Sequence, residues 1–514
     1  MKRREAKPSA GRWLSAIERV GNALPHPITL FALLTLAVVV ISALCAAVGL
    51  SVTGELIVNG EVTETTVEAV SLLTGEGLAY IFTSAVTNFT TYAPLGMVLV
   101  AMLGVGVAEQ SGLIGAVLKR TVQLTPRSLV TPVIVFLGVM SNIASDAGYV
   151  VLIPLGAMVF RSCGRHPLAG LAAAFAGVSG GFSANLIVGS LDPMLAGISE
   201  AAATIIDPNY KVSVMGNWYF LFVSTFLITI LGTLITDKVV EPRLAAVSSQ
   251  APQEEHEIQR LTGEERSALR WAGFAALAYV ALLAAACIPQ NSFFRNEAGE
   301  LIGDTPLIAS VVPLIALLFL IPGVVYGLRA GTFRGERDVC EAMSATMSSM
   351  GSFLALSFVS AQFINYFNYT KLGTLLALAG ANFFKSIQIG LIPLMVIFVL
   401  FSAFMNLFIG SASAKWNILA PVFVPMFMLL GYRPELCQLA YRIGDSCTNV
   451  ITPLMAYFAV IVVLARRYDP KAGIGTLIAT MLPYSICFLA GWTLLMILWL
   501  SLGLPIGPGV GLYL

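Results

Sequence analysis

Five uninterrupted apolar stretches constrain this chain more than any other feature. They lie near residues 28–50, 217–237, 270–288, 305–328 and 474–500. Each approaches the roughly 20 residues that a helix needs to cross the hydrocarbon core of a bilayer. Only 11% of the residues are charged, against about 25% in a soluble domain. The sequence therefore predicts an all-α polytopic membrane protein.

Charge and motifs exclude several classes of function. The 29 Lys and Arg residues oppose 28 Asp and Glu residues, so the net charge of +1 provides no basic surface for nucleic acid. The three histidines and seven cysteines show neither zinc-ligand nor disulfide spacing. Nucleotide-loop, zinc-protease and hydrolase motifs are missing, so we expect no enzyme, no cofactor and no transition metal. We interpret the pairs Gly104/Gly106 and Gly473/Gly475 as close-packing residues.

The distribution of Lys and Arg predicts which side of the membrane each loop occupies. The N-terminal segment is rich in Lys and Arg, which favours a cytoplasmic location. The loop 51–76 has five Glu and no Lys or Arg, as expected outside. We divide the chain into a cytoplasmic N-terminal segment, two repeats joined by a charged cytoplasmic linker, and a tail: 1–27, 28–243, 244–269, 270–505 and 506–514.

Four less regular segments, at 77–110, 168–206, 342–365 and 435–465, bring the expected spanning segments to about nine. Glycine, proline and polar residues interrupt two of them, so we predict broken helices at 168–206 and 435–465.

Two further regions predict re-entrant helical hairpins. The region 128–160 has two apolar arms of about a dozen residues, each rising only ~20 Å, on either side of a polar tip. The region 387–430 repeats this plan around residues 410–415. An ordinary span followed by a buried loop is the alternative for the first region.

One sequence offset relates the two halves of the chain. Pro154 and Pro421, Gly164 and Gly431, Pro167 and Pro434, and Gly177 and Gly444 are each 267 positions apart. Because the two hairpins are expected to enter from opposite sides, the repeat is inverted. Inverted repeats with discontinuous helices are typical of secondary transporters, whose sites lie where the breaks meet. A channel would explain the re-entrant loops but not this pairing.

Ionisable residues at membrane depth are costly and so are candidate site residues. Arg442 and Asp445 stand three residues apart and would either neutralise each other or serve a substrate. In the second case Arg442 would bind the substrate carboxylate, and Asp445 would hold the guanidinium or meet a donor on the substrate. Trp416, beside Lys415, would stack on an aromatic ring or serve as an interfacial anchor or packing residue.

Polar clusters at the hairpin tips and helix breaks suggest sites for a hard cation such as Na⁺. The first cluster comprises Asn142, Ser145, Asp146, Ser183 and Asn185, and the second comprises Ser411, Ser413, Ser446, Thr448 and Asn449. These side chains would alternatively only satisfy backbone groups freed by the breaks. Asp192 and Asp445 would alternatively carry protons, so Na⁺ and H⁺ both remain possible coupling ions.

Four runs resemble the p-aminobenzoyl-glutamate transporter (AbgT) family: SNIASDAGYVVLIPLGA (141–157), GGFSANLIVGSLDP (180–193), GSASAKWNILAPVFVPM (410–426) and YRIGDSCTNVITPLMAYF (441–458). The resemblance implies a homodimer in the bacterial inner membrane, with nine spanning helices and two hairpins per protomer. Matched motif by motif, it implies a substrate pathway that includes Asp192, Ser413, Trp416, Pro434, Arg442, Asp445 and Pro453.

The expected function is cation-coupled secondary transport of p-aminobenzoyl-glutamate-like aromatic carboxylates across the inner membrane. The substrate class, a folate catabolite, is implied by the resemblance, as is the alternative of proton-driven export of sulfonamide antimetabolites, which confers antimicrobial resistance. A channel or a membrane-embedded enzyme is the rival of another class. The expected partners are an anionic aromatic small molecule, membrane lipid and a second copy of the chain.

Overall fold

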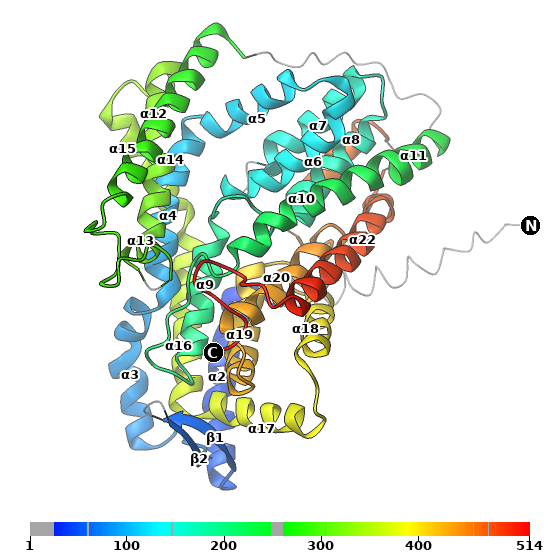
Figure 1. The fold of residues 1–514 in the computed structure, drawn as a ribbon. Coiled ribbons are helices and arrows are strands. Elements are labelled where there is room, and N and C mark those ends of the chain that lie inside the picture. The colour runs from blue at the N-terminus through cyan, green and yellow to red at the C-terminus, as the bar shows by residue number, and fades with distance from the viewer. Residues whose placement is uncertain are drawn as a thin grey trace, which may run out of the picture.

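The computed structural model describes residues 25–58, 61–144, 148–247, 261–303, 305–455, 457–470 and 472–514, and these are mostly helical (Figure 1). The first half contains α2 (Pro27–Ala47), β1 (Ser51–Val58), β2 (Glu61–Glu68), α3 (Gly75–Thr90), α4 (Ala93–Gln110), α5 (Leu113–Leu124), η1 (Arg127–Leu129), α6 (Val130–Ser141), η2 (Asn142–Ala144), η3 (Gly148–Leu152), α7 (Ile153–Ser162), α8 (Pro167–Phe175), η4 (Ala176–Gly180), α9 (Leu191–Ala203), α10 (Trp218–Ile235), η5 (Thr236–Val240) and α11 (Glu241–Val247).

The second half contains α12 (Gly263–Cys287), α13 (Pro306–Ala309), α14 (Val311–Ala330), α15 (Glu336–Ser349), α16 (Gly351–Tyr369), α17 (Leu372–Ser386), α18 (Leu391–Asn406), α19 (Ala412–Leu429), α20 (Pro434–Asn449), α21 (Phe458–Arg466) and α22 (Ile474–Ser501).

Within the described residues, seven helices are long and apolar enough to cross a bilayer, or eight if one bent pair counts as a span. Six of them match expected spans, and the bent pair, α15 with α16, turns by 44° where one span over 342–365 is expected. The segments 168–206 and 435–465 contain no single helix of spanning length among their described residues. The expected total of nine spans therefore stays a prediction.

The expectation of an all-α chain is wrong at the loop 51–76. Strands β1 and β2 pair there as an antiparallel hairpin, with Ser51 opposite Glu68. The missed signal is local: β-branched Val and Thr residues flank Asn59–Gly60 in the sequence, a dipeptide that favours tight hairpin turns. The β1–β2 hairpin and helix α17 lie together at one end of the molecule (Figure 1).

Both segments that we expected to be broken helices are interrupted. Helix α8 continues into the π-helical turn η4, which is followed by non-helical residues until α9 begins at Leu191. Helix α20 ends at Asn449, and α21 begins only at Phe458.

The turns before α8 and α20 are alike. Gly164 and Gly431 both adopt positive φ, and Pro167 and Pro434 occupy the first positions of α8 and α20. This likeness agrees with the 267-residue offset.

The two regions expected as hairpins each contain a pair of helices. The first contains α6 and α7, and the second contains α18 and α19. Because α19 is itself 18 residues long and apolar enough to cross a bilayer, length does not separate a re-entrant arm from a span there. Membrane re-entry therefore stays a prediction for both regions.

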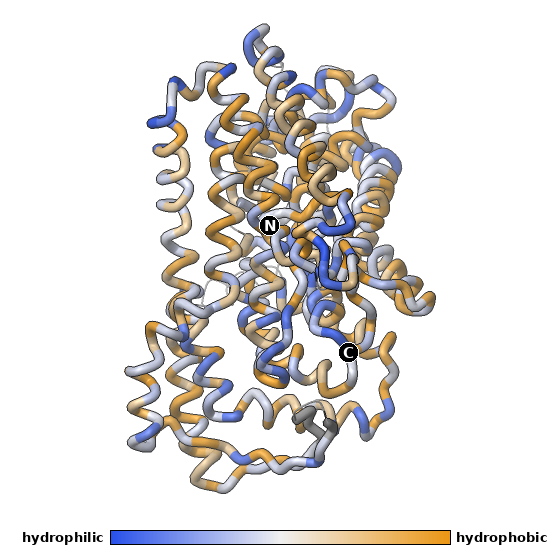
Figure 2. The backbone as a smooth tube through the Cα atoms, turned by 60° about the vertical axis from the view of Figure 1, so that its left-hand side comes forward, coloured by the Kyte–Doolittle hydropathy of each residue, from blue (hydrophilic) through white to orange (hydrophobic). Residues whose placement is uncertain are grey.

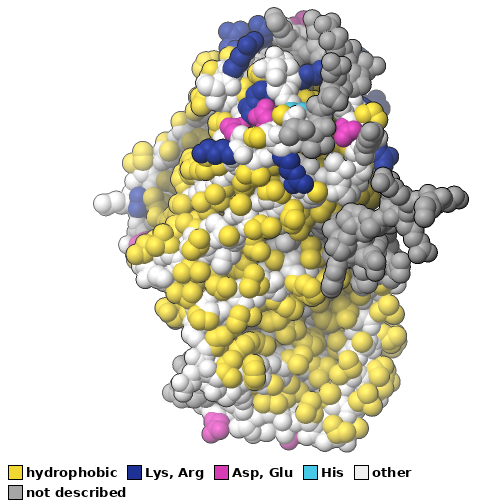
Figure 3. Space-filling view, turned by 90° about the vertical axis from the view of Figure 1, so that its right-hand side faces the viewer, with side chains coloured by type: hydrophobic (Ala, Val, Ile, Leu, Met, Phe, Trp, Pro, Cys, Tyr) yellow, Lys and Arg dark blue, Asp and Glu magenta, His cyan; other side chains and the backbone are white. Residues whose placement is uncertain are grey.

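The outer surface is apolar over most of its height. Figure 3 shows one face on which hydrophobic side chains dominate and Lys and Arg gather towards the upper end. Figure 2 shows hydrophobic residues along the long helices. On α12, Phe274, Leu277 and Leu282 are 64%, 67% and 71% exposed. Exposed apolar surface of this extent is expected where lipid rather than water surrounds the protein.

Helices α9, α19 and α20 lie towards the centre of the molecule, where segments from both halves meet, and α18 packs on α20 (Figure 1). Helix α4 packs on α9 and also on α14, which in turn packs on α12. Helices α6, α10 and α22 pack together on another side. This arrangement buries the two helix breaks inside the protein.

Glycines permit two of the closest helix contacts. A Cβ on Gly104 would lie 1.9 Å from the carbonyl oxygen of Ala316, and one on Gly106 would lie 2.1 Å from the Thr346 hydroxyl. The interpretation of these glycines as close-packing residues is therefore correct. It is wrong for Gly473 and Gly475, where nothing lies within 4 Å of an added Cβ.

We predict that Gly104→Ala destabilises the protein by about 1–3 kcal/mol, because the methyl group would force α4 away from the backbone of α14. Gly475→Ala is the matched control and should leave stability nearly unchanged, since its methyl group meets open space. Thermal unfolding in detergent measures both. Equal unfolding temperatures for the two variants would contradict this account of helix packing.

Candidate functional site

Helix α20 is a polar helix in the interior of the protein. All 16 of its residues are buried, although it carries Glu435, Gln438, Arg442, Asp445 and several smaller polar residues. Gly444 allows this burial, because a Cβ there would lie 2.3 Å from the carbonyl oxygen of Val399 on α18. Since unpaired polar groups are costly at such depth, each needs a partner from another element.

Arg442 on α20 forms an ion pair with Asp192 at the start of α9. Its Nη2 donates to Asp192 Oδ1 at 2.5 Å, and both side chains are buried. The other carboxylate oxygen, Oδ2, accepts the backbone N–H of Gly189 at 2.6 Å. The Nε of Arg442 has no hydrogen-bond partner. The pair thus joins the break of the first half to the polar helix of the second and leaves one guanidinium donor unused.

Asp445 pairs with a residue other than Arg442, so the expectations that the two neutralise each other and that Asp445 holds the guanidinium are wrong. Asp445 Oδ1 instead lies 2.5 Å from Nζ of Lys415 on α19. The expectation took account only of the three-residue spacing on one helix. Asp192 on α9 and Lys415 on α19 instead bring opposite charges to within 2.5 Å of Arg442 and Asp445, respectively. Binding of a substrate carboxylate by Arg442 stays a prediction.

Trp416 is fully buried, which contradicts a role as an interfacial anchor. Its ring stacks on Tyr441 with centroids 4.5 Å apart and an interplanar angle of 25°. Its indole N–H donates to Ser199 Oγ at 3.0 Å, and Ser199 in turn donates to Gln438 Oε1 at 3.1 Å. Trp416 therefore packs α19 against both α9 and α20.

The first polar cluster contains three buried side-chain oxygens that lack a hydrogen-bond partner: Asn142 Oδ1, Ser183 Oγ and Asn185 Oδ1. Gly189 lies between two of these residues, since a Cβ there would be 3.2 Å from Asn185 Nδ2 and 3.3 Å from the Asn142 carbonyl oxygen. Ser145 and Asp146 lie outside the described residues.

The oxygens of the second cluster are largely engaged within the protein. Asn406 Nδ2 donates to Thr448 Oγ1 at 2.9 Å and to Asn449 Oδ1 at 2.8 Å. Ser446 Oγ accepts the backbone N–H of Ser183 at 3.1 Å, which links the two clusters. Ser411 Oγ caps α19 by accepting from Ala414 N, and lies 3.4 Å from Ser413 Oγ. These contacts favour the alternative in which this cluster satisfies groups freed by the break.

The two predicted prolines lie apart from the ion pair. Pro434 begins α20, eight residues and so about 12 Å along the axis from Arg442. Pro453 is half-buried in the non-helical connection between α20 and α21.

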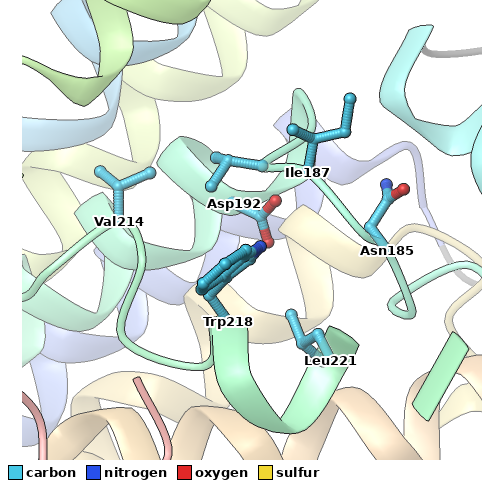
Figure 4. A pocket seen from close by; sticks show the side chains of 7 residues that line it. Asn185, Ile187, Asp192, Val214, Trp218 and Leu221 are labelled. Carbon is cyan, nitrogen blue, oxygen red and sulfur yellow. The ribbon is translucent and has the colours of Figure 1, made fainter. Parts of the chain in front are cut away.

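A small cavity adjoins Asp192. Asn185, Ile187, Val188, Asp192, Val214, Trp218 and Leu221 line it (Figure 4). Its volume of about 10 Å³ is near the minimum for one water molecule. In this arrangement of the elements the cavity is too small for an aromatic carboxylate.

Sequence reasoning missed several residues of this region, including Asn406, Ser199, Gln438, Tyr441 and Glu435. Asn406 interrupts an apolar run, and this would have marked it as an embedded polar group. Glu435 is 2% exposed and accepts from the Tyr210 hydroxyl at 3.1 Å. The helical period of 3.6 residues does not mark Gln438 or Tyr441, because α20 is buried on all sides. Ser199 lies on α9.

Comparisons with known proteins agree with one another. The model of the AbgT putative transporter family matches residues 12–514. The p-aminobenzoyl-glutamate transport protein of Escherichia coli K12 is 38% identical over 501 residues, which are 98% of this chain and 97% of that protein.

Two solved structures are similar along nearly the whole chain. The YdaH transporter of Alcanivorax borkumensis has a TM-score of 0.88 and 47% identity, covering 94% of this chain and 100% of that one. MtrF of Neisseria gonorrhoeae, described with a class of antimetabolite efflux pumps, has a TM-score of 0.90 and 47% identity, covering 97% of this chain and 100% of that one. The chain belongs to the AbgT family of putative transporters.

Proposed function

We propose that this protein is a cation-coupled secondary transporter of p-aminobenzoyl-glutamate-like aromatic carboxylates across the inner membrane. The observation that carries the proposal is the buried ion pair between Arg442 and Asp192, which joins the helix break of one half to the polar helix of the other. The named substrate of the Escherichia coli relative is a dianion with an aromatic ring. A planar guanidinium is well suited to bind such a carboxylate in a bidentate manner.

In the proposed cycle, a substrate carboxylate replaces Asp192 on Arg442 when the break 181–190 moves away from α20. The unused Nε of Arg442 supplies the second donor of a bidentate contact. The exchange keeps the guanidinium paired with a carboxylate, which avoids the cost of an isolated buried charge.

Coupling to Na⁺ is proposed through the first polar cluster. Asn142, Ser183 and Asn185 present neutral oxygens without hydrogen-bond partners, and hard cations bind such oxygens. Asp192 is the alternative carrier, since its protonation would release Arg442 and couple transport to H⁺ instead. Ser145 and Asp146 are proposed as further ligands on the basis of the sequence alone.

Export of sulfonamide antimetabolites is the second candidate function. The 47% identity to MtrF favours it, and the Arg442–Asp192 pair would accept an exported anion as readily as an imported one. A homodimeric multi-pass arrangement with a cytoplasmic N-terminus is proposed with either function, supported by the basic residues at that end of the chain.

The proposal is tested by flux of p-aminobenzoyl-glutamate into proteoliposomes under separately imposed Na⁺ and pH gradients. A cation-coupled transporter accumulates substrate under one of these gradients, whereas a channel only equilibrates it. Chemically unchanged substrate after transport distinguishes a transporter from an embedded enzyme. Equal flux with and without both gradients would contradict the coupled mechanism.

We predict that the double variant Arg442→Gln with Asp192→Asn folds with nearly normal thermal stability but loses flux by about tenfold or more. The paired substitution leaves no isolated buried charge, but it removes a charge-assisted contact worth about 1.5–3 kcal/mol to the substrate. Arg337→Ala is the control, because Arg337 is exposed and pairs only within α15. Normal flux in the double variant would reduce the ion pair to a structural role.

We predict that Asn185→Ala raises the Na⁺ concentration for half-maximal flux by about tenfold, which corresponds to loss of about 1.4 kcal/mol of ion binding. Asn209→Ala in an exposed turn is the matched control and should leave Na⁺ dependence unchanged. An unaltered Na⁺ response in Asn185→Ala, together with a response to the pH gradient, would favour Asp192 as a proton carrier.

A further inference from the structure

The side-chain ammonium of Lys415 lies in a closed cage of oxygen atoms. Its Nζ is 2.5 Å from Asp445 Oδ1 and 3.3 Å from the carbonyl oxygen of Ile409, and it also donates to Asn406 Oδ1. The lysine side chain is fully buried. One carboxylate, one amide and one backbone carbonyl are also the kinds of ligand that a small hard cation takes.

Contacts that do not involve Lys415 hold this cage in place. The amide nitrogen of Asn406 lies within hydrogen-bond distance of the backbone oxygen of Asp445, at 2.6 Å, and of two side-chain oxygens of α20, so its two N–H donors are engaged there and its Oδ1 is directed towards the ammonium. The hydroxyl of Tyr441 lies 3.3 Å from Asp445 Oδ1 and 2.7 Å from the carbonyl oxygen of Ala412. The oxygens are therefore oriented by the protein rather than only by the lysine.

The first half of the chain does not repeat this cage. At the 267-residue offset, Lys415, Asn406 and Asp445 correspond to Gly148, Val139 and Val178, none of which has a charged or polar side chain. The first half instead has three buried oxygens without partners near its break. The two halves thus differ: the Lys415 ammonium occupies the oxygen cage of the second half, whereas the three oxygens of the first half have no such partner.

We propose that the cage around Asp445 is a monovalent-cation site that the Lys415 ammonium occupies permanently. A tethered cation neutralises Asp445 at every external Na⁺ concentration and does not leave during a transport cycle. One consequence rests on the proposed function: an exchangeable coupling cation binds only to the first-half cluster, and the second half contributes none.

The test empties the cage in two different ways. Lys415→Ala removes the ammonium and leaves space for Na⁺ with water, whereas Lys415→Met removes the charge but fills the space with an apolar chain of similar length. The full-length protein is purified in detergent, and its thermal unfolding is compared in NaCl and in choline chloride at equal ionic strength. The response of the wild type is subtracted, which removes any contribution of the first-half cluster.

We expect Na⁺ to raise the unfolding temperature of Lys415→Ala by about 2–3 °C beyond its effect on the wild type. Lys415→Met should show no such excess, and neither should Lys415→Ala combined with Asp445→Asn, which lacks the carboxylate ligand. Methylammonium chloride, which resembles the lost head group, should stabilise Lys415→Ala in the same way. An identical response of Lys415→Ala and Lys415→Met to both salts would overturn the proposal.

If Lys415→Ala folds poorly, the salt dependence of its folding still tests the proposed cation site. If Lys415→Ala folds in Na⁺ or methylammonium but not in choline, the cation site is supported. If Lys415→Ala folds in none of the three salts although Lys415→Met folds, the proposal is contradicted. These measurements need no substrate. An absence of p-aminobenzoyl-glutamate flux would therefore count against the proposed function, but not against the proposal that the cage is a cation site.

Discussion

The buried ion pair between Arg442 and Asp192 is the interaction on which the centre of this structure depends. Asp192 is the second residue of α9, which follows the non-helical stretch that interrupts the first half, and Arg442 lies on a helix of the second half. Removing one partner from such a pair typically costs about 3–5 kcal/mol, because a buried charge is left uncompensated. A replacement anion on Arg442 would avoid this cost when the pair opens.

Helix α20 is ion-paired to two neighbouring helices. Two of its buried ionisable residues pair with different neighbours, Arg442 with Asp192 on α9 and Asp445 with Lys415 on α19, so both neighbours are tied to one polar element. Trp416 on α19 and Tyr441 on α20 are both fully buried and stack on each other. Low local dielectric strengthens each ion pair and raises the cost of leaving either one unmade. A substrate that opens one pair while the other stays closed would move α9 relative to α19.

Much of this architecture is predictable from the sequence, and the remainder has physical reasons. Long apolar runs identified most spans, glycine, proline and polar residues identified both breaks, and the cost of embedded charge marked Asp192, Arg442 and Asp445 as buried groups that need partners. Their partners were not predictable, because the spacing of Arg442 and Asp445 on one helix says nothing about charges that other helices bring nearby. Asn406 was missed because a single amide in an apolar run has no periodic pattern. The β-hairpin was missed because the loop 51–76 was interpreted only by its charge, and not by the β-branched residues around Asn59–Gly60.

The central claim is that a substrate carboxylate takes the place of Asp192 on Arg442. An experimental structure of the wild-type protein with p-aminobenzoyl-glutamate bound tests it most directly. The account predicts a substrate carboxylate within hydrogen-bond distance of the Arg442 guanidinium and an Asp192 carboxylate that has moved out of contact with it. A bound substrate beside an unbroken Arg442–Asp192 pair, at the 2.5 Å separation seen without substrate, would contradict the claim.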